Sequence, residues 1–143
     1  MVKIFLDTNV IMDFLESTRT RHIISGTIVR ECLVGNITGC ISETGITNCS
    51  YLLKKTYSQK QQNEIFFNFS RFFKILGLTS NALETACKVN ISDLEDAILY
   101  QVALENNCSY FITSNLADFT SIAQPSLKVF SPEYFWEWYE NEK

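Results

Sequence analysis

The sequence predicts an α/β protein, a three-layer α/β/α sandwich in which a parallel sheet of about five strands lies between two layers of helices. Short apolar runs, as expected of strands buried on both faces, alternate with longer stretches of helical periodicity. This alternating order is typical of a parallel sheet with right-handed crossovers. With 143 residues, 46% of them hydrophobic, the chain has the size of a single domain over residues 1–143 with a sizeable core.

Five short runs are predicted to be strands. Each contains four or five residues, mostly apolar or β-branched, which suits a strand without a solvent face. The first run starts at the second residue, so the chain enters its sheet almost immediately. The predicted strands are Val2–Leu6, Ile37–Ile41, Lys74–Gly77, Ser109–Thr113 and Leu127–Phe130.

Seven helices are predicted between and after these strands. Ile24, Ile28 and Cys32 recur every four residues, which places them on one helix face. The stretch 59–73 carries a stripe of aromatic residues, for which core packing is favoured over a base-stacking surface. The predicted helices are Asn9–Glu16, Thr20–Gly35, Ser42–Thr56, Gln59–Phe73, Ser80–Val89, Leu94–Asn106 and Pro132–Tyr139.

Composition limits the classes of function. The net charge is −4, so any contact with nucleic acid must be local, for example through Lys54, Lys55, Lys60 or Arg71. Five cysteines without a Cys-x-x-Cys pair, together with a single histidine, predict neither a disulfide framework nor a zinc site. No signal peptide or membrane-spanning run is present in the sequence, so we expect a protein of the reducing cytoplasm that does not bind membranes.

Acidic residues stand where a parallel sheet collects its ligands. Asp7 directly follows the first predicted strand, Asp118 lies in a short loop after the fourth, and Asp93 and Asp96 share one face at the start of a helix. Ligands of open parallel sheets bind at the carboxyl ends of the strands. Converging carboxylates repel one another unless a divalent cation neutralises them. The acids therefore predict a Mg²⁺ or Mn²⁺ site that acts on phosphate esters.

Each acid taken alone also has a purely structural interpretation. Asp7 is a suitable N-cap for the helix that follows it, as are Ser92 and Asp93 for the later helix. Glu95 favours the dipole of that helix, and Asp118 suits a turn. These interpretations stay open for single residues. No P-loop, GxGxxG or GxSxG motif is present, so nucleotide-cofactor and serine-hydrolase functions have no support.

Four segments stand out for their order and spacing. They are Phe5–Ile11 (FLDTNVI), Asp93–Ala97 (DLEDA), Ile112–Phe119 (ITSNLADF) and Ser131–Phe135 (SPEYF). Together they resemble the PIN domain, the fold of VapC-type toxin ribonucleases. The resemblance covers almost the whole chain, and the order of the segments is more specific than any one of them.

The resemblance implies a PIN-like sandwich, a site of three or four acids that binds Mg²⁺ or Mn²⁺, and cleavage of single-stranded RNA by an activated water. Asp7, Asp96 and Asp118 take the places of the family's catalytic, metal-binding acids. Asn115 lies where other members carry an Asp, so the resemblance implies that it is a neutral ligand or a substrate contact. Thr113 is the first residue of the same Thr-x-Asn-x-x-Asp-Phe pattern. An antitoxin protein and a second copy of the chain are the implied partners.

One position departs from the family pattern. Members usually carry a Glu about six residues beyond the Ser that opens the helix after the second strand, and counting from Ser42 that position holds Asn48. Glu43 lies on the first turn of the same helix, where capping is its alternative role. Five residues rotate a helix by about 140°, so we expect only Asn48 to face the site. Metal affinity should be lower as a result, unless Asp93 or Glu95 compensates.

Three functions compete on this evidence. The leading one is a metal-dependent endoribonuclease, the toxin of a type II toxin–antitoxin pair. The second is a catalytically weakened PIN-like module that binds RNA or a protein partner, and Asn48 is its main support. The third is a phosphoacceptor or phosphatase domain with Asp7 as nucleophile. That class usually needs a Lys near the site, and none follows a later predicted strand closely.

Overall fold

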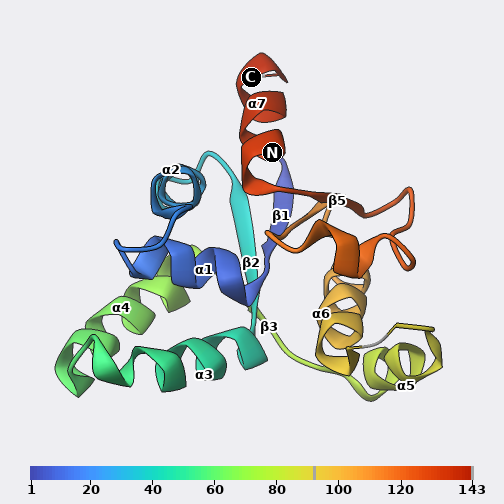
Figure 1. The fold of residues 1–143 in the computed structure, drawn as a ribbon, viewed down its shortest axis with the longest axis horizontal. Helices are drawn as coiled ribbons and strands as arrows, with labels where there is room; N and C mark the ends of the chain where they lie inside the picture. Colours follow the sequence, from blue (N-terminus) through green and yellow to red (C-terminus); the bar gives the residue numbers. More distant parts are fainter. Residues whose placement is uncertain (92, 143) are drawn as a thin grey trace.

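A computed structural model describes residues 1–91 and 93–142 of the protein. Within them, five strands form one parallel sheet in the order β3-β2-β1-β4-β5 (Figure 1). β2 and β3 extend the sheet on one side of β1, and the chain then crosses to the other side of β1 to form β4 and β5. The direction of strand addition therefore reverses between β1 and β4. Such a reversal is where parallel sheets bind ligands. The strands are β1 (Lys3–Leu6), β2 (Thr38–Ser42), β3 (Lys74–Leu76), β4 (Tyr110–Ile112) and β5 (Lys128–Phe130).

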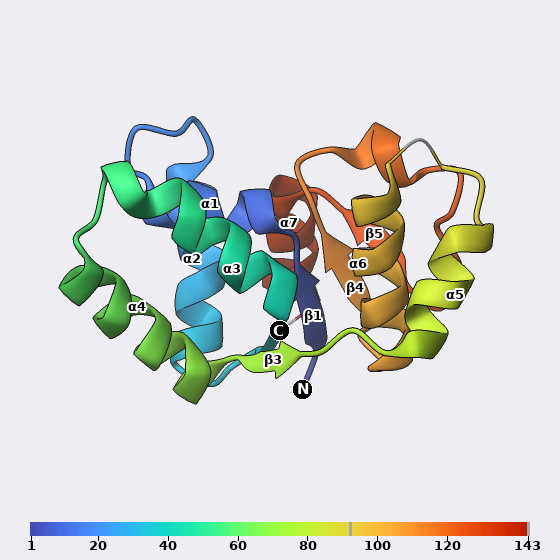
Figure 2. The ribbon, with the colours of Figure 1, turned by 90° about the horizontal axis from the view of Figure 1, so that it is seen from below.

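Helices cover both faces of the sheet, which confirms the predicted α/β/α sandwich. Figure 2 shows α5 and α6 on one side and α1 to α4 on the other. The C-terminal α7 packs beside α2. Their bounds are α1 (Thr8–Leu15), α2 (His22–Leu33), α3 (Glu43–Leu52), α4 (Gln59–Phe72), α5 (Ser80–Lys88), α6 (Leu94–Glu105) and α7 (Pro132–Glu142), with 3₁₀ helices η1 (Leu53–Lys55) and η2 (Leu116–Phe119).

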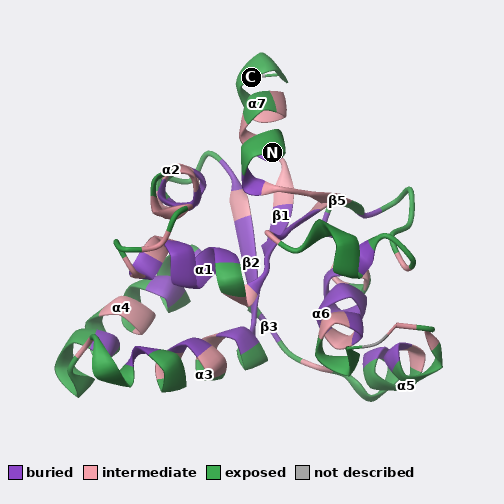
Figure 3. Ribbon diagram, in the orientation of Figure 1, coloured by how far each residue is buried: buried purple, intermediate pink, exposed green. Residues whose placement is uncertain are grey.

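The central strand β1 divides the core into two clusters. Ile4 and Leu6 belong to the cluster under α1, α2, α3, α4 and α7, whereas Phe5 belongs to the cluster under α5 and α6. All three side chains are at most 1% exposed, because successive residues of a strand point to opposite faces. Phe5 stacks on Phe111 of β4 with 5.0 Å between ring centroids. Figure 3 shows this burial along the strands and on the inner sides of the helices.

Gly39 of β2 permits a close approach that another residue would prevent. A Cβ atom at this position would lie 2.7 Å from the ring of Phe73 and 2.8 Å from Sγ of Cys32. Both neighbours are buried, so neither has room to withdraw. The absence of a side chain at Gly39 therefore lets α2 and the end of α4 pack directly on the sheet.

Three details differ from the sequence-based expectations. The aromatic stripe of α4 is only partly in the core: Phe69 and Phe73 are buried, but Phe72 is 50% exposed. The helix predicted to run to residue 56 changes to 3₁₀ geometry after Leu52. Asp118, expected in a loop, lies in η2. Among the described residues, no helix has the length and apolar character needed to cross a membrane.

Candidate functional site

A cavity of about 400 Å³ opens at the carboxyl end of the sheet, where the topology reverses. Its lining comes from the segment after β1, from α3, from the start of α6 and from the segment after β4. Five acidic residues line it: Asp7, Asp93, Glu95, Asp96 and Asp118. The remaining lining residues are Thr8, Asn9, Asn48, Tyr51, Leu52 and Asn115. None of the described lining residues is basic, so the acids lack an internal counter-charge.

Asp7 is the most deeply buried of these acids, at 4% exposed. It is the N-cap of α1, and its Oδ1 accepts a hydrogen bond from the Thr8 N–H at 2.8 Å. Its Oδ2 accepts one from the Thr113 hydroxyl at 2.8 Å. Burial raises the pKa of Asp7, the hydrogen bonds from Thr113 and Thr8 lower it, and the charges of Glu95 and Asp118 raise it further. Asp7 therefore caps a helix and also lines the pocket.

Thr113 connects Asp7 to the segment after β4. It is fully buried, and its hydroxyl donates to Asp7 while accepting the N–H of Asn115 at 3.1 Å. The backbone makes the same connection, since the Asp7 N–H donates to the Ile112 carbonyl at 3.0 Å. Both hydrogen bonds hold the Asp7 carboxylate in a fixed position relative to Asn115.

Asp96 lies at the packed edge of α6, next to the fully buried Ala97. Asp93 caps this helix by accepting the N–H of Glu95 at 2.9 Å, while Ser92 lies outside the described residues. The pKa of Asp96 is raised to about 7, first by burial and then by the charges of Asp93, Asp7, Asp118 and Glu95. The negative charges of the pocket thus act on one another.

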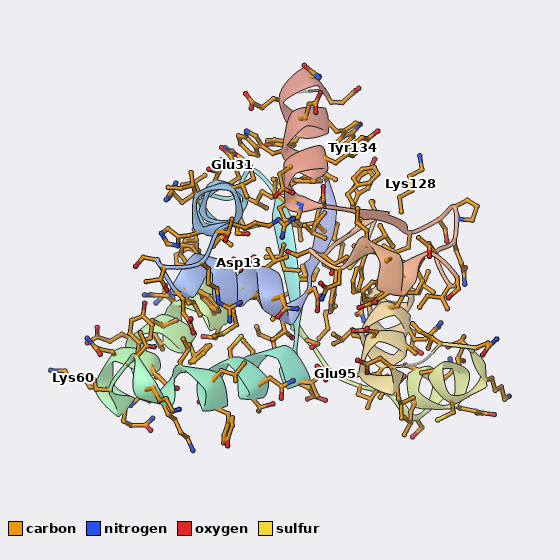
Figure 4. The ribbon with its side chains drawn as sticks, viewed as in Figure 1. Asp13, Glu31, Lys60, Glu95, Lys128 and Tyr134 are labelled. Carbon is orange, nitrogen blue, oxygen red and sulfur yellow. The ribbon has the colours of Figure 1, made fainter. Side chains whose placement is uncertain are left out.

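The structure separates the roles of Asn48 and Glu43. Asn48 lines the pocket, and its Nδ2 donates to Oε1 of Glu95 at 3.1 Å, which joins α3 to α6. Figure 4 shows Glu95 between these two helices. Glu43 lies outside the lining and accepts the Leu78 N–H at 3.0 Å, on the segment after β3. It does not cap α3, because Ser42 does so by accepting the N–H of Gly45 at 2.9 Å.

The pocket residues fit a hard divalent cation in their chemistry. As they stand, no three Asp, Glu, His or Cys side chains in the described parts of the chain are grouped closely enough to hold one ion. The polar side chains of the lining nevertheless offer oxygen ligands, mainly carboxylates and amides with the hydroxyls of Thr8 and Tyr51, and Mg²⁺ and Mn²⁺ prefer oxygen. Burial first and then the neighbouring negative charges raise the pKa of Asp96, and a cation would offset those charges.

Tyr51 and Leu52 are lining residues that the sequence analysis did not identify. They lie three and four positions beyond Asn48, so all three share one face of α3. Helical periodicity counted from Asn48 is therefore the signal that could have found them. The sequence gives no indication that this face looks onto α6 rather than into solvent.

Comparisons with known proteins match most of the chain. The model of the PIN domain family matches residues 3–117, ending one residue before Asp118. Ribonuclease VapC1 of Aquifex aeolicus (strain VF5) is 29% identical over an alignment of 140 residues, and the match covers 94% of this chain and 94% of that protein.

Two solved structures share the fold. A toxin–antitoxin complex from Klebsiella pneumoniae contains a chain with a TM-score of 0.67 and 22% identity, covering 90% of this chain and 97% of that one. DNA-bound VapBC from Salmonella typhimurium contains one with a TM-score of 0.66 and 17% identity, covering 92% and 99%. At these identities the likeness to the two structures concerns the fold alone.

Proposed function

The chain belongs to the PIN domain family, and from this premise we propose that it is a metal-dependent endoribonuclease that cleaves phosphodiester bonds of single-stranded RNA. The observation that carries the proposal is the pocket of five acidic residues at the point where the sheet reverses. The similarity to Ribonuclease VapC1 over 94% of the chain supports the same class of reaction.

In this proposal Asp7, Asp96 and Asp118 hold Mg²⁺ or Mn²⁺, and Asn115 is a neutral ligand or a substrate contact. When bound, the ion supplies polarisation of the phosphodiester and a lower pKa for the attacking water. Thr113 keeps the Asp7 carboxylate oriented through its hydroxyl. Asp93 and Glu95 add negative charge to the same pocket and strengthen its attraction for a cation.

We also propose that the chain is the toxin of a type II toxin–antitoxin pair and acts as a homodimer in the cytoplasm. The Klebsiella pneumoniae structure with the same fold is a toxin–antitoxin complex, which supports a protein partner. All five cysteines carry free thiols, as expected in a reducing compartment. Co-expression with the product of the adjacent reading frame tests the partner: a stable complex in which RNA cleavage is inhibited is expected.

The test of the activity is cleavage of a labelled single-stranded RNA with Mg²⁺, with Mn²⁺ and with EDTA. We expect cleavage that EDTA abolishes and excess Mn²⁺ restores, and no cleavage of the same sequence as a blunt duplex. The second candidate is a weakened PIN-like module, favoured by an amide at position 48 of the pocket. Binding of the RNA without cleavage under any of these conditions would favour that candidate.

A further inference from the structure

One wall of the pocket carries an exposed aromatic residue that the proposed chemistry does not use. This outer wall consists of Asn48, Tyr51 and Leu52 on one face of α3. Tyr51 is 70% exposed and Leu52 is 51% exposed, whereas Gly45 and Cys49 form the buried face of the same helix. Packing of α3 on the core therefore does not account for the large apolar side chains of the outer wall.

A flat ring beside an acidic pocket suits a ligand with two unlike parts. A phosphate can bind to a cation held by carboxylates, and a flat conjugated group can stack on the face of a tyrosine ring. A nucleotide combines the two. Stacking of bases on aromatic side chains is a general way in which proteins hold single strands, and it tolerates any base because every base has a π-face.

Lys54 adds a positive charge next to this ring. Its Nζ lies 5.2 Å from the centroid of the Tyr51 ring, and the residue is exposed. A cation–π contact in water is weak, so a base can replace the ammonium over the ring while the ammonium moves to a phosphate. In a chain of net charge −4, a cation beside the acidic pocket matters for holding a polyanion.

We propose that Tyr51 stacks on an unpaired base of the RNA substrate and that Lys54 contacts a neighbouring phosphate. The proposal rests on the proposed ribonuclease function and names a residue that decides its specificity. Because bases inside a duplex have no free face, a stacking requirement at Tyr51 selects single-stranded RNA.

A second copy of the chain is the other occupant that the outer wall could take. The observations favour RNA, because the apolar part of the outer wall is two side chains next to five acidic residues. Charged residues are depleted from the cores of protein interfaces, and an interface of ordinary size needs about 800 Å² from each partner.

The test compares Tyr51→Leu with Tyr51→Phe in binding a fluorescein-labelled RNA decamer with phosphorothioate linkages that resist cleavage, measured by anisotropy in the presence of Mn²⁺ so that the carboxylates are neutralised and the strand stays intact. We expect Kd to rise about 5- to 100-fold in Tyr51→Leu, and to change less than about twofold in Tyr51→Phe. In cleavage with Mn²⁺, Tyr51→Leu should raise KM and leave kcat nearly unchanged. Tyr134→Leu is the matched control, since Tyr134 is 58% exposed and lies on α7, far from Glu95 (Figure 4).

An abasic scan separates stacking from other losses. One abasic position should weaken binding to the wild type by the same factor as Tyr51→Leu, and should have no further effect in that variant. Lys54→Gln should reduce the slope of log Kd against log salt concentration by about 0.7, the value for one phosphate contact on a single strand. Lys128→Gln should leave the slope unchanged, because the exposed Lys128 is the first residue of β5, at the opposite end of the sheet from the pocket and far from Glu95 (Figure 4).

The outcomes distinguish a failure of base stacking at Tyr51 from a failure of the proposed ribonuclease function. Equal binding by wild type and Tyr51→Leu, alongside ion-dependent cleavage, would overturn stacking and leave the ribonuclease function standing. Equal abasic losses in both proteins would also overturn it, as would conversion of a dimer to a monomer in Tyr51→Leu without a base-dependent loss. A wild-type protein that neither binds nor cleaves RNA would overturn both proposals.

Discussion

The pocket has two walls of different construction. The inner wall is Asp7 with Thr113 behind it: both residues directly follow strands and are at most 4% exposed, and the Thr113 hydroxyl donates a hydrogen bond to the Asp7 carboxylate. The outer wall, Asn48, Tyr51 and Leu52, lies on a helix surface and is joined to α6 by the hydrogen bond between Asn48 and Glu95. One wall is fixed by the packing of the core, and the other is nearly independent of it.

This difference separates chemistry from specificity. A buried carboxylate with two hydrogen-bond donors keeps one orientation, which is what a metal ligand needs. Exposed side chains on a helix can change without cost to the core, because surface substitutions usually alter stability by less than about 0.5 kcal/mol. We therefore expect changes in the inner wall to abolish the reaction, and changes in the outer wall to tune what the pocket accepts.

The largest effect is expected from Asp7→Asn. The amide has nearly the same shape, so the fold should persist, and the loss of a buried charge should keep the melting temperature at or above that of the wild type. Cleavage of single-stranded RNA should fall by at least about 100-fold, since even residues that only support a metal ligand are worth 10- to 100-fold.

Asp13→Asn is the matched control for Asp7→Asn. Asp13 is another buried carboxylate of α1, but it pairs with Arg19 at 3.4 Å and lies outside the pocket lining. This variant should cleave RNA as the wild type does. If Asp7→Asn unfolds, or cleaves at the wild-type rate, Asp7 is a structural cap only and the inner wall has no role in the reaction.

Thr113→Val tests whether the inner wall works as a unit. It removes the hydroxyl that donates to Asp7 and accepts from Asn115 without changing the side-chain volume. Cleavage should fall about 10- to 100-fold, and the free energy of unfolding by about 1 kcal/mol. The Thr113 bond lowers the pKa of Asp7, so the acid limb of the pH–rate profile should move to higher pH.

Thr113→Ser keeps the hydroxyl and should retain most of the activity and the wild-type acid limb. Cleavage rates across pH and urea unfolding of the three proteins measure these effects. Equal losses in the Val and Ser variants would mean that the methyl group matters and that the hydrogen bond to Asp7 does not.

The fold and the position of Asp7 can be predicted well because the signal for each lies within a few neighbouring residues. Strands buried on both faces appear as short apolar runs, and an acid such as Asp7 that directly follows a run can be assigned to a strand end. The ends of helices are harder to predict. The aromatic stripe that includes Phe72 was predicted in the core, but Phe72 ends α4 half exposed, whereas the extended backbone at Phe73 turns the next ring into the core. The four residues of η2 are too few to show a period, which is why Asp118 was placed in a loop.

The outer wall could not be predicted in the same way. Whether Tyr51 faces solvent or a pocket depends on where α6 passes, and α6 begins more than forty residues later. No pattern within α3 carries that information. Asn48 was singled out only because the resemblance to the PIN domain marked its position, so the part of the site that depends on long-range packing came from the family pattern or was missed.

Asn48→Glu tests the outer wall by adding a negative charge to it. A further carboxylate in the pocket should tighten Mn²⁺ binding about 10-fold, measured by calorimetric titration. Glu43→Gln is the control and should bind Mn²⁺ like the wild type, because Glu43 bonds to the Leu78 N–H outside the pocket. No gain in Asn48→Glu, together with a loss of activity in Glu43→Gln, would show that Glu43 is the acid that matters.

The smallest effect is the change in stability that we expect from Asp96→Asn, a variant that should also lose cleavage because Asp96 is a proposed metal ligand. Asp96 has a pKa of about 7 in the folded protein against an ordinary 3.8, so the folded state holds a proton that the unfolded chain releases between about pH 4 and 7. The free energy of unfolding of the wild type should therefore fall as pH rises through this window. Asp96→Asn removes this contribution, about 1 kcal/mol after allowance for screening by solvent at a half-buried group.

Urea unfolding between pH 4 and 8 measures the difference, with Glu84→Gln as the control because Glu84 is an exposed acid paired with Lys88 on α5. The control should follow the wild-type curve, and Asp96→Asn should be flatter. Saturating Mn²⁺ should stabilise the wild type at pH 8 more than Asp96→Asn, since only the wild type regains a ligand when the repulsion is relieved. Parallel curves for Asp96→Asn and the wild type would place Asp96 outside the electrostatic reach of the inner wall, and would leave Asp7 without its partner across the pocket.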